Sequence, residues 1–285
     1  MAAKITTRLP QPEGVVAGGT ATFRIPTGRR IHKLILAYAY NASTQNVADF
    51  TEIRIYINGQ VFQRFNGTER DTLNKFDRLE ASTGVLVIPF DRENLNILAS
   101  IEETALNTGV ADPQTGKRIT SMYMEIDLDS GMTIAASDLT LYSVESDPLP
   151  GGPGTVPYIR REQRSPAGAD SDYQISDLVN PGINAPDKIA LNRVTFIPST
   201  GTLASLRIDR NNFIVFDRTD AINRAVQNGL KKTAQSGYYT IDTTEQGEGG
   251  AVINLFDITD YRYRVNASTA MTLTILSEYM GVLTA

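Results

Sequence analysis

The strongest constraint in the sequence is that one order of local patterns occurs twice, once in each half of the chain. In the first half, residues 53–57 alternate as Ile-Arg-Ile-Tyr-Ile, and the chain then turns at Asn58-Gly59. An Asn-Gly pair between alternating runs is a strong signal of a tight β-hairpin with positive φ at the glycine. In the second half, residues 206–216 predict a similar hairpin, about 150 residues later.

Each predicted hairpin runs directly into a helical pattern. In the first helix Leu73, Phe76 and Leu79 share one face, with Thr68 as the expected N-cap. The second helix is expected to follow Asp217 or Thr219. Its shared apolar face consists of Ala221, Ile222, Ala225, Val226 and Leu230. Strand patterns return after each helix, so the chain is predicted to be all-β, with one helix per half and two β-sandwiches.

The best domain boundary is the segment 147–157, which contains four prolines and three glycines. Such a segment is not expected to form a helix or a central strand. We therefore predict an N-terminal sandwich at residues 1–148, a Pro/Gly-rich linker at 149–172 and a C-terminal sandwich at 173–285.

The amino-acid composition excludes several kinds of reactive or metal-binding site. The chain has no Cys, which excludes disulfides and thiolate sites, and one His, which excludes a multi-His metal site within one chain. A Ser-His-Asp triad would have to use His32. That residue lies in an apolar strand pattern, where we expect packing and not catalysis. We predict no catalytic residue, no cofactor or metal site, and a protein that is not an enzyme.

Two segments contain candidate interface residues. The densest basic cluster contains Arg160, Arg161 and Arg164, which are expected to form ion pairs across an interface or between the two halves. In the C-terminal stretch, Met280, Val282 and Leu283 are apolar and follow the last predicted strand, where a monomer would leave them exposed. The candidate residues of this stretch are Tyr279, Met280, Val282 and Leu283.

Several pieces of the sequence, in their order, resemble a known family. They are the tail Ser277-Glu-Tyr-Met-Gly-Val282, the segment Tyr158-Ile-Arg-Arg161, the segment Tyr173-Gln-Ile-Ser-Asp-Leu178, and the two hairpin-plus-helix units at residues 53–79 and 206–231. Together with the repeated sandwich, they resemble the double jelly-roll major capsid protein of tailless, membrane-containing icosahedral dsDNA phages of the corticovirus type. The segment 147–157 and the loop 104–118 have no match in that pattern.

The resemblance implies two tandem eight-stranded jelly rolls standing side by side. It implies a homotrimer with a pseudo-hexagonal outline that tiles a shell around an internal membrane and a dsDNA genome. The implied partners are further copies of the chain, minor capsid or penton proteins, membrane-associated virion proteins and the internal lipid membrane, without specific nucleic acid recognition. The implied location is the virion, after synthesis in the cytoplasm of a bacterial host.

Two other classes of protein compete with this interpretation. A bacterial carbohydrate-binding or adhesin module would usually carry a signal peptide and exposed aromatic platforms, but the start of the chain lacks an apolar h-region and Trp is absent. An enzyme on a cupin scaffold needs clustered His and carboxylate ligands, which one His does not supply. The net charge of −5 also argues against general attraction to nucleic acid.

Overall fold

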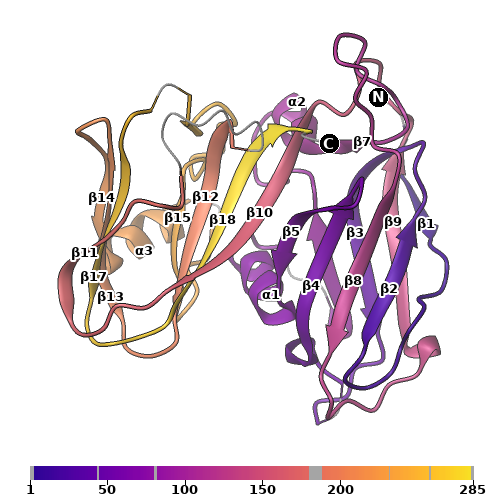
Figure 1. The fold of residues 1–285 in the computed structure, drawn as a ribbon, viewed down its shortest axis with the longest axis horizontal. Coiled ribbons are helices and arrows are strands. Elements are labelled where there is room, and N and C mark those ends of the chain that lie inside the picture. The colour runs from indigo at the N-terminus through magenta and orange to yellow at the C-terminus, as the bar shows by residue number, and fades with distance from the viewer. Residues whose placement is uncertain are drawn as a thin grey trace.

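The structure, a computed structural model, describes residues 3–43, 45–79, 82–179, 188–230, 232–256 and 258–283. Two β-sandwiches stand side by side along the longest axis of the molecule, and both chain ends lie on the upper side of the pair in the view of Figure 1. The first sandwich contains β1 (Ile5–Arg8), β2 (Thr20–Ile25), β3 (Arg30–Tyr38), β4 (Phe50–Ile57), β5 (Gln60–Phe65), α1 (Gly67–Phe76), β6 (Val85–Pro89), α2 (Leu98–Ile101), β7 (Leu106–Asn107), β8 (Met122–Leu128) and β9 (Leu139–Ser146), with short 3-10 turns at Val47–Asp49, Glu102–Thr104 and Ala136–Asp138.

The second sandwich contains β10 (Thr155–Arg164), β11 (Asp170–Ile175), β12 (Ala190–Pro198), β13 (Leu203–Arg210), β14 (Phe213–Thr219), α3 (Asp220–Gly229), β15 (Tyr239–Asp242), β16 (Ile253–Asn254), β17 (Tyr261–Ala267) and β18 (Leu273–Val282). Within each sandwich, inward side chains from both sheets form the core, as the alternating burial of β8 and β17 shows.

The repeat predicted from the sequence holds strand by strand. In the first half the two sheets have the orders β1-β9-β3-β6 and β2-β8-β4-β5, with β7 beside β3. In the second half they have the orders β10-β18-β12-β15 and β11-β17-β13-β14, with β16 beside β12. Adding nine to each strand number converts the first pattern into the second. The expected double jelly roll is therefore confirmed.

The hairpin turns repeat in atomic detail. Asn58 and Gly59 have φ values of 50° and 81°, and Asn211 and Asn212 have values of 48° and 67°. Positive φ at Gly59 is therefore confirmed, and it fits the mirror-type turn that matches strand twist. In both halves the side-chain oxygen of the first turn residue accepts hydrogen bonds from the backbone N–H groups of two consecutive residues. Those residues are Thr120 and Ser121 in the first half, and Thr259 and Asp260 in the second.

The helix starts agree only in part with the sequence prediction. The N-cap of α1 is Asn66, not Thr68: the Asn66 side chain accepts a hydrogen bond from the N–H of Glu69, whose carboxylate accepts one in return from the N–H of Asn66. The expected N-cap Thr219 does begin α3.

The shared apolar face of α3 is not the face that this helix buries. Its buried residues are Asn223 and Gln227, whose amides both donate to the carbonyl of Thr240 at 2.7 Å. Ile222, on the apolar face, is 56% exposed. The amide anchors hold α3 to the sheet by hydrogen bonds, so its apolar face points away from the core of its own sandwich.

The predicted linker at residues 149–172 is also wrong in part. Residues 155–164 form β10, which pairs along its whole length with β18 and through Ile159 and Gln63 with β5 of the first sandwich. One sheet therefore runs through both halves, and the second half of the repeat begins at β10 and not at residue 173. The prolines do not prevent this, because those at 148, 150 and 153 precede the strand and only Pro157 lies within it.

The hairpin repeat supplies a matched test of turn strain. An added Cβ at Gly59 would meet no atom within 4 Å, so a side chain there is opposed only by the backbone conformation. We expect Gly59→Val to lower the free energy of unfolding by about 1–2 kcal/mol, because a β-branched residue resists positive φ. Gly59→Asn should be close to neutral, since Asn212 occupies the same position in the second half. Urea unfolding of both variants checks this, and equal stability of the two would contradict it.

Candidate functional site

The contact between the two sandwiches, here called the seam, is formed by β5 and α1 on one side and by β10 with its neighbours on the other. The side-chain amide of Gln63 donates to the carbonyl of Pro157 at 2.9 Å, and the Arg160 guanidinium donates to the carbonyl of Val61 at 3.1 Å. Phe62 packs edge-on against Tyr158, with ring centroids 6.3 Å apart. The free edge of one sandwich is thus covered by the other.

The structure places two of the three predicted arginines at the seam. Arg160 lies there as described, and Arg161 donates to both carboxylate oxygens of the buried Glu69 at 3.0 and 3.1 Å. Arg164 instead pairs with Asp177, which belongs to the same sandwich, at 2.7 and 3.1 Å. A role for these arginines in contacts between chains stays a prediction.

Met280, Val282 and Leu283 were expected to be exposed in a monomer, and this expectation is wrong for Met280 and Leu283. Tyr279, Met280 and Leu283 are buried, and only Val282 is exposed. The physical reason is that β18 continues to Val282 as a central strand between β10 and β12. This segment is part of the core of the second sandwich and not a free tail.

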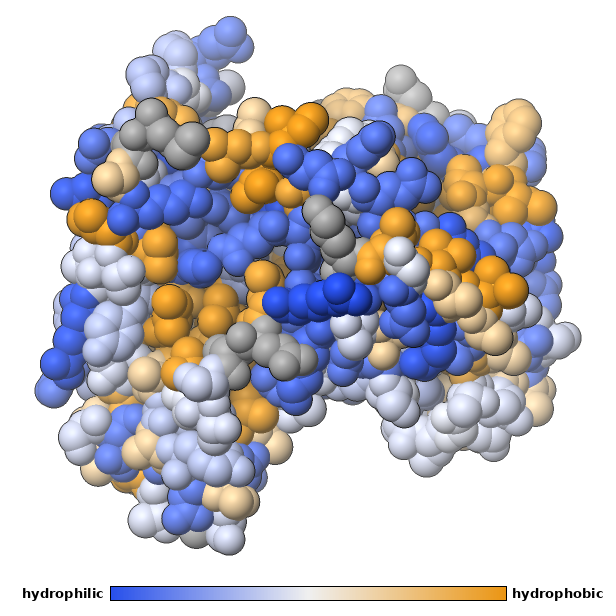
Figure 2. Space-filling view, turned by 180° about the vertical axis from the view of Figure 1, so that it is seen from behind, coloured by the Kyte–Doolittle hydropathy of each residue, from blue (hydrophilic) through white to orange (hydrophobic). Residues whose placement is uncertain are grey.

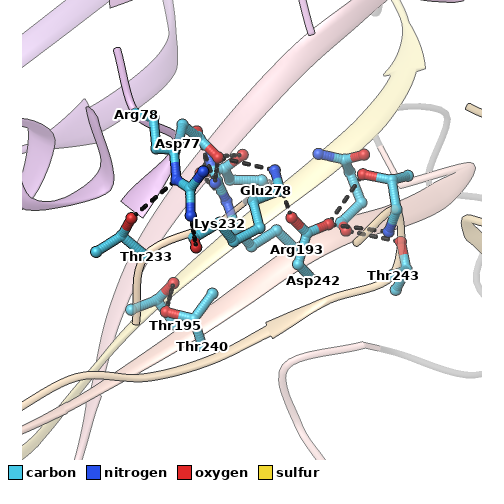
Figure 3. A network of polar contacts seen from close by, with 12 residues as sticks. Asp77, Arg78, Arg193, Thr195, Lys232, Thr233, Thr240, Asp242, Thr243 and Glu278 are labelled. Carbon is cyan, nitrogen blue, oxygen red and sulfur yellow. Dashed lines mark hydrogen bonds and ion pairs between the residues drawn. The ribbon is translucent and has the colours of Figure 1, made fainter. Parts of the chain in front are cut away.

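Beside β10, a buried network of charges crosses the seam (Figure 3). Asp77, at the C-terminal end of α1, accepts hydrogen bonds from Arg193 on β12 at 2.8 Å and from Lys232 at 2.9 Å. Arg193 also contacts Glu278 on β18 at 2.7 Å, and Lys232 contacts Asp242 on β15 at 2.8 Å. Asp77 comes from the first sandwich and these other four side chains from the second, so the network joins α1 to three strands of the second sandwich.

The pKa values in this network follow from burial and pairing. Burial raises the pKa of the Asp77 carboxyl, but the attraction of Arg193 and Lys232 outweighs it and holds that pKa well below its usual range. Burial lowers the pKa of Lys232, and the attraction of Asp77 and Asp242 raises it by more. The folded state therefore stabilises the charged form of each group.

Arg70 lies fully buried next to this network. Its Nε donates to the side-chain oxygen of Asn74 at 3.1 Å, and one terminal nitrogen has no hydrogen-bond partner among the described residues. Burial lowers the pKa of Arg70 to about 10. A cavity of about 60 Å³ is lined by Arg70, Asp77, Arg193 and Lys232 among others, which leaves room for about one or two ordered waters.

His32 is packed as the sequence analysis expects, but within a polar cluster. Its Nδ1 lies 2.8 Å from Asp91 Oδ2 and its Nε2 lies 2.8 Å from Ser146 Oγ. Ser146 is 5% exposed, so a substrate carbonyl does not reach its hydroxyl. His32, Asp91 and Glu102 could together offer metal ligands, but the ammonium of Lys4 already contacts the two carboxylates at 3.1 and 2.9 Å. The cluster thus has the residue types of a catalytic triad, but a substrate does not reach them.

Sequence reasoning missed the buried network. Its five members come from one helix end, three strands and a loop, at positions 77, 193, 232, 242 and 278, and no spacing between them marks a shared site. The one available signal is that a charged residue, Arg193, stands in a strand pattern that is mainly apolar.

Both halves of the chain match models of known domains. Residues 6–145 match the viral coat protein P2 N-terminal domain, and residues 156–283 match the viral coat protein P2 C-terminal domain. The two matches follow the order of the two sandwiches, and the second begins within β10. No sequence among curated proteins matches the chain.

Solved structures show the same fold. The chain is similar to the major capsid protein P2 from bacteriophage PM2, with 17% identity, a TM-score of 0.82 and coverage of 99% of this chain and 98% of that chain. It is also similar to the STIV MCP, with 13% identity, a TM-score of 0.65 and 97% coverage of both chains. The PBCV-1 virus capsid is a third neighbour, with 12% identity, a TM-score of 0.57 and coverage of 98% of this chain and 93% of that chain.

The buried network predicts a large effect of one substitution. Asp77→Asn leaves Arg193 and Lys232 short of an anion in a buried site, which should lower the free energy of unfolding by about 3–5 kcal/mol. Asp71→Asn on the same helix is the matched control, because Asp71 pairs with Lys75 at the surface and such pairs contribute about 0.3–0.5 kcal/mol. Thermal or urea unfolding at pH 7 measures both. Similar losses in the two variants would contradict the role of the network.

The same residue predicts a pH dependence. A carboxyl whose pKa is lowered on folding stabilises the folded state above its unfolded pKa of about 3.9, and this stabilisation is lost as pH falls below that value. The difference in stability between the parent and Asp77→Asn should therefore be full at pH 5–7 and shrink as the solution is acidified below about pH 4. A difference that stays constant down to the acid transition would show that Asp77 does not titrate in this way.

Proposed function

The chain belongs to the viral coat protein P2 family, and from this we propose that three copies form the capsomer of an icosahedral virion shell. As a member of this family the chain is a capsid protein, with a structural role in the virion. The single observation that carries the proposal is that both coat-protein domains are matched in order, over residues 6–145 and 156–283.

The trimer is supported by the internal repeat. Each chain supplies two sandwiches of the same topology that stand side by side. Three chains supply six such units, and a ring of six similar units has the pseudo-hexagonal outline that tiles a shell. Closed rings of identical chains are the ordinary result of a head-to-tail contact whose rotation closes.

The finer parts of the proposal rest on the resemblance to the corticovirus-type phages. They are an internal membrane and a dsDNA genome beneath the shell, minor capsid or penton proteins and membrane-associated proteins as partners, and synthesis in a bacterial cytoplasm. Within the described part of the chain, no helix has the length and apolar character needed to cross a membrane. A net charge of −5 is compatible with a shell that encloses DNA without recognising its sequence.

The size of the purified protein tests the proposal. We expect a species of about 94 kDa, three times the chain mass of 31.2 kDa, or larger particles, in light scattering coupled to size exclusion. Negative-stain images should show a three-fold particle with a six-sided outline. A species of 31.2 kDa at every concentration tested would contradict the capsomer and would favour an isolated binding module.

A further inference from the structure

The internal repeat places a second copy of the seam surface on the outside of the molecule. From β4 to β6 and from β13 to β15, corresponding residues differ by 153 in number, as the turns at Asn58 and Asn211 and the N-caps Asn66 and Thr219 show. The hairpin bulges keep the same relation, since Ile55 pairs with Gln63 and Ile208 pairs with Phe216. Every residue of β5 and α1 at the seam therefore has an identified counterpart on β14 or α3.

These counterparts are apolar, and all but the half-buried Phe216 are exposed. At the seam, β5 and α1 present Val61, Phe62, Gln63 and Glu69, and their counterparts are Ile214, Val215, Phe216 and Ile222. Gln60, which begins β5, corresponds to Phe213. Phe213 is 75% exposed, Ile214 54% and Val215 42%. The exposed Ile222 stands where Glu69 is buried under Arg161. The outward apolar face of α3 thus takes the place of the α1 face that the second sandwich covers.

The partner strand of this surface is identified by the same repeat. In the first half, β10 covers the edge of β5, and the counterpart of β10 is β1. The strand pairs β3–β9 and β12–β18 each contain a bulge, at His32 and at Asn192. Matching the two bulges aligns Glu145 on β9 with Tyr279 on β18. Glu145 lies opposite Ile5, and Tyr279 lies opposite Tyr158. The correspondences that follow are Thr6 with Ile159, Thr7 with Arg160, and Arg8 with Arg161.

Both edges are open in the single chain. Among the described residues, β1 pairs only with β9, and all four of its residues are exposed. In the same part of the chain β14 pairs only with β13. The two strands lie at opposite ends of the long axis, so one chain does not join them to each other (Figure 1). From behind, apolar patches are visible over both halves of the molecule (Figure 2).

We infer that β1 of one copy adds to the edge of β14 of the next copy, in the parallel arrangement that joins β10 to β5 within the chain. The bridge corresponding to Ile159 and Gln63 would join Thr6 to Phe216 of the neighbouring copy. An open strand edge with exposed apolar side chains is a template for a further strand, and native proteins normally cover such an edge. The occupant is a second copy of this chain, because the repeat supplies the matching strand and the pairing.

The chemistry of the two edges fits this contact. Ile5, 43% exposed, takes the place of the buried Tyr158 and would pack on the apolar surface of β14 and α3. Arg8 and Asp217 form no ion pair among the described residues, and in the inferred arrangement they lie within two positions of the bridge on opposite strands. The contact between copies would then be mainly apolar, whereas the seam within the chain is closed by buried charges.

The inference rests on the proposed capsomer and specifies its contact. A head-to-tail contact that repeats the relation of the two sandwiches within the chain makes a ring in which first and second sandwiches alternate. Because three chains supply six sandwiches, closure after three copies requires each sandwich to be rotated from the one before it by one sixth of a circle.

Engineered cysteines test the contact directly, because the chain has no Cys of its own. A variant with both Thr6→Cys and Phe216→Cys should form disulfides between copies on mild oxidation, as the two positions would face each other across neighbouring strands. Non-reducing gels should show a closed product of about 94 kDa, three times 31.2 kDa, that reducing agent returns to one chain. Each single-cysteine variant and the pair Thr6→Cys with Ile97→Cys are controls, since Ile97 is exposed and directly precedes α2, which lies away from β14 (Figure 1).

A charge on the open edge gives a second test that leaves the fold of each sandwich intact. Ile214→Lys should raise the concentration at which trimers dissociate by about tenfold or more, because the contact would bury the new charge. Ile97→Lys replaces another exposed apolar residue and should leave that concentration unchanged. Light scattering over a dilution series measures both, and circular dichroism confirms that each variant is folded.

The outcomes separate this inference from the proposed function. Trimers that neither cross-link through Thr6 and Phe216 nor weaken with Ile214→Lys would overturn the β1–β14 contact and leave the capsomer standing. A protein that is monomeric at all concentrations would overturn both. Cross-linked products that continue beyond three chains would overturn closure of the ring by this contact.

Discussion

The arrangement of the molecule depends on β10, a strand that serves both sandwiches. It pairs with β18 along ten residues and with the edge of β5 through Ile159 and Gln63. A sheet edge with unsatisfied backbone groups attracts a further strand, and covering it with the second sandwich both satisfies the edge and fixes the two halves relative to each other. The buried side chains around it, Phe62 and Tyr158, then pack as a core and not as two surfaces in contact.

The charges beside β10 make this contact specific for one relative position of the two sandwiches. Asp77 reaches across from the first sandwich and meets two cations of the second, Arg193 on β12 and Lys232 on the loop before β15. Apolar packing tolerates small displacements of one sandwich against the other, whereas a buried carboxylate is stable only where its partners are in place. The network therefore favours one position of the sandwiches over others with similar apolar contact.

The repeat is conserved in backbone and hydrogen bonds but not in surface chemistry. Asn74 and Gln227 anchor their helices through the carbonyls of Val87 and Thr240, at corresponding positions. The outward residues differ: α1 carries Glu69, paired with Arg161, where α3 carries the exposed Ile222. Equivalent surfaces thus have different roles, since one is closed within the chain and the other is open to another molecule.

The sequence by itself determined the local elements and their repetition, because alternation, an Asn-Gly turn and a capping residue such as Thr219 act over a few neighbouring residues. It did not reveal that β10 is a strand, because the prolines before it dominate the local pattern. The inward side of α3 was also decided by tertiary structure, since Asn223 and Gln227 hydrogen-bond to a carbonyl of β15 and turn the apolar side outward. The buried network likewise depends on residues far apart in the chain, and only the packing of the two sandwiches brings its charges together.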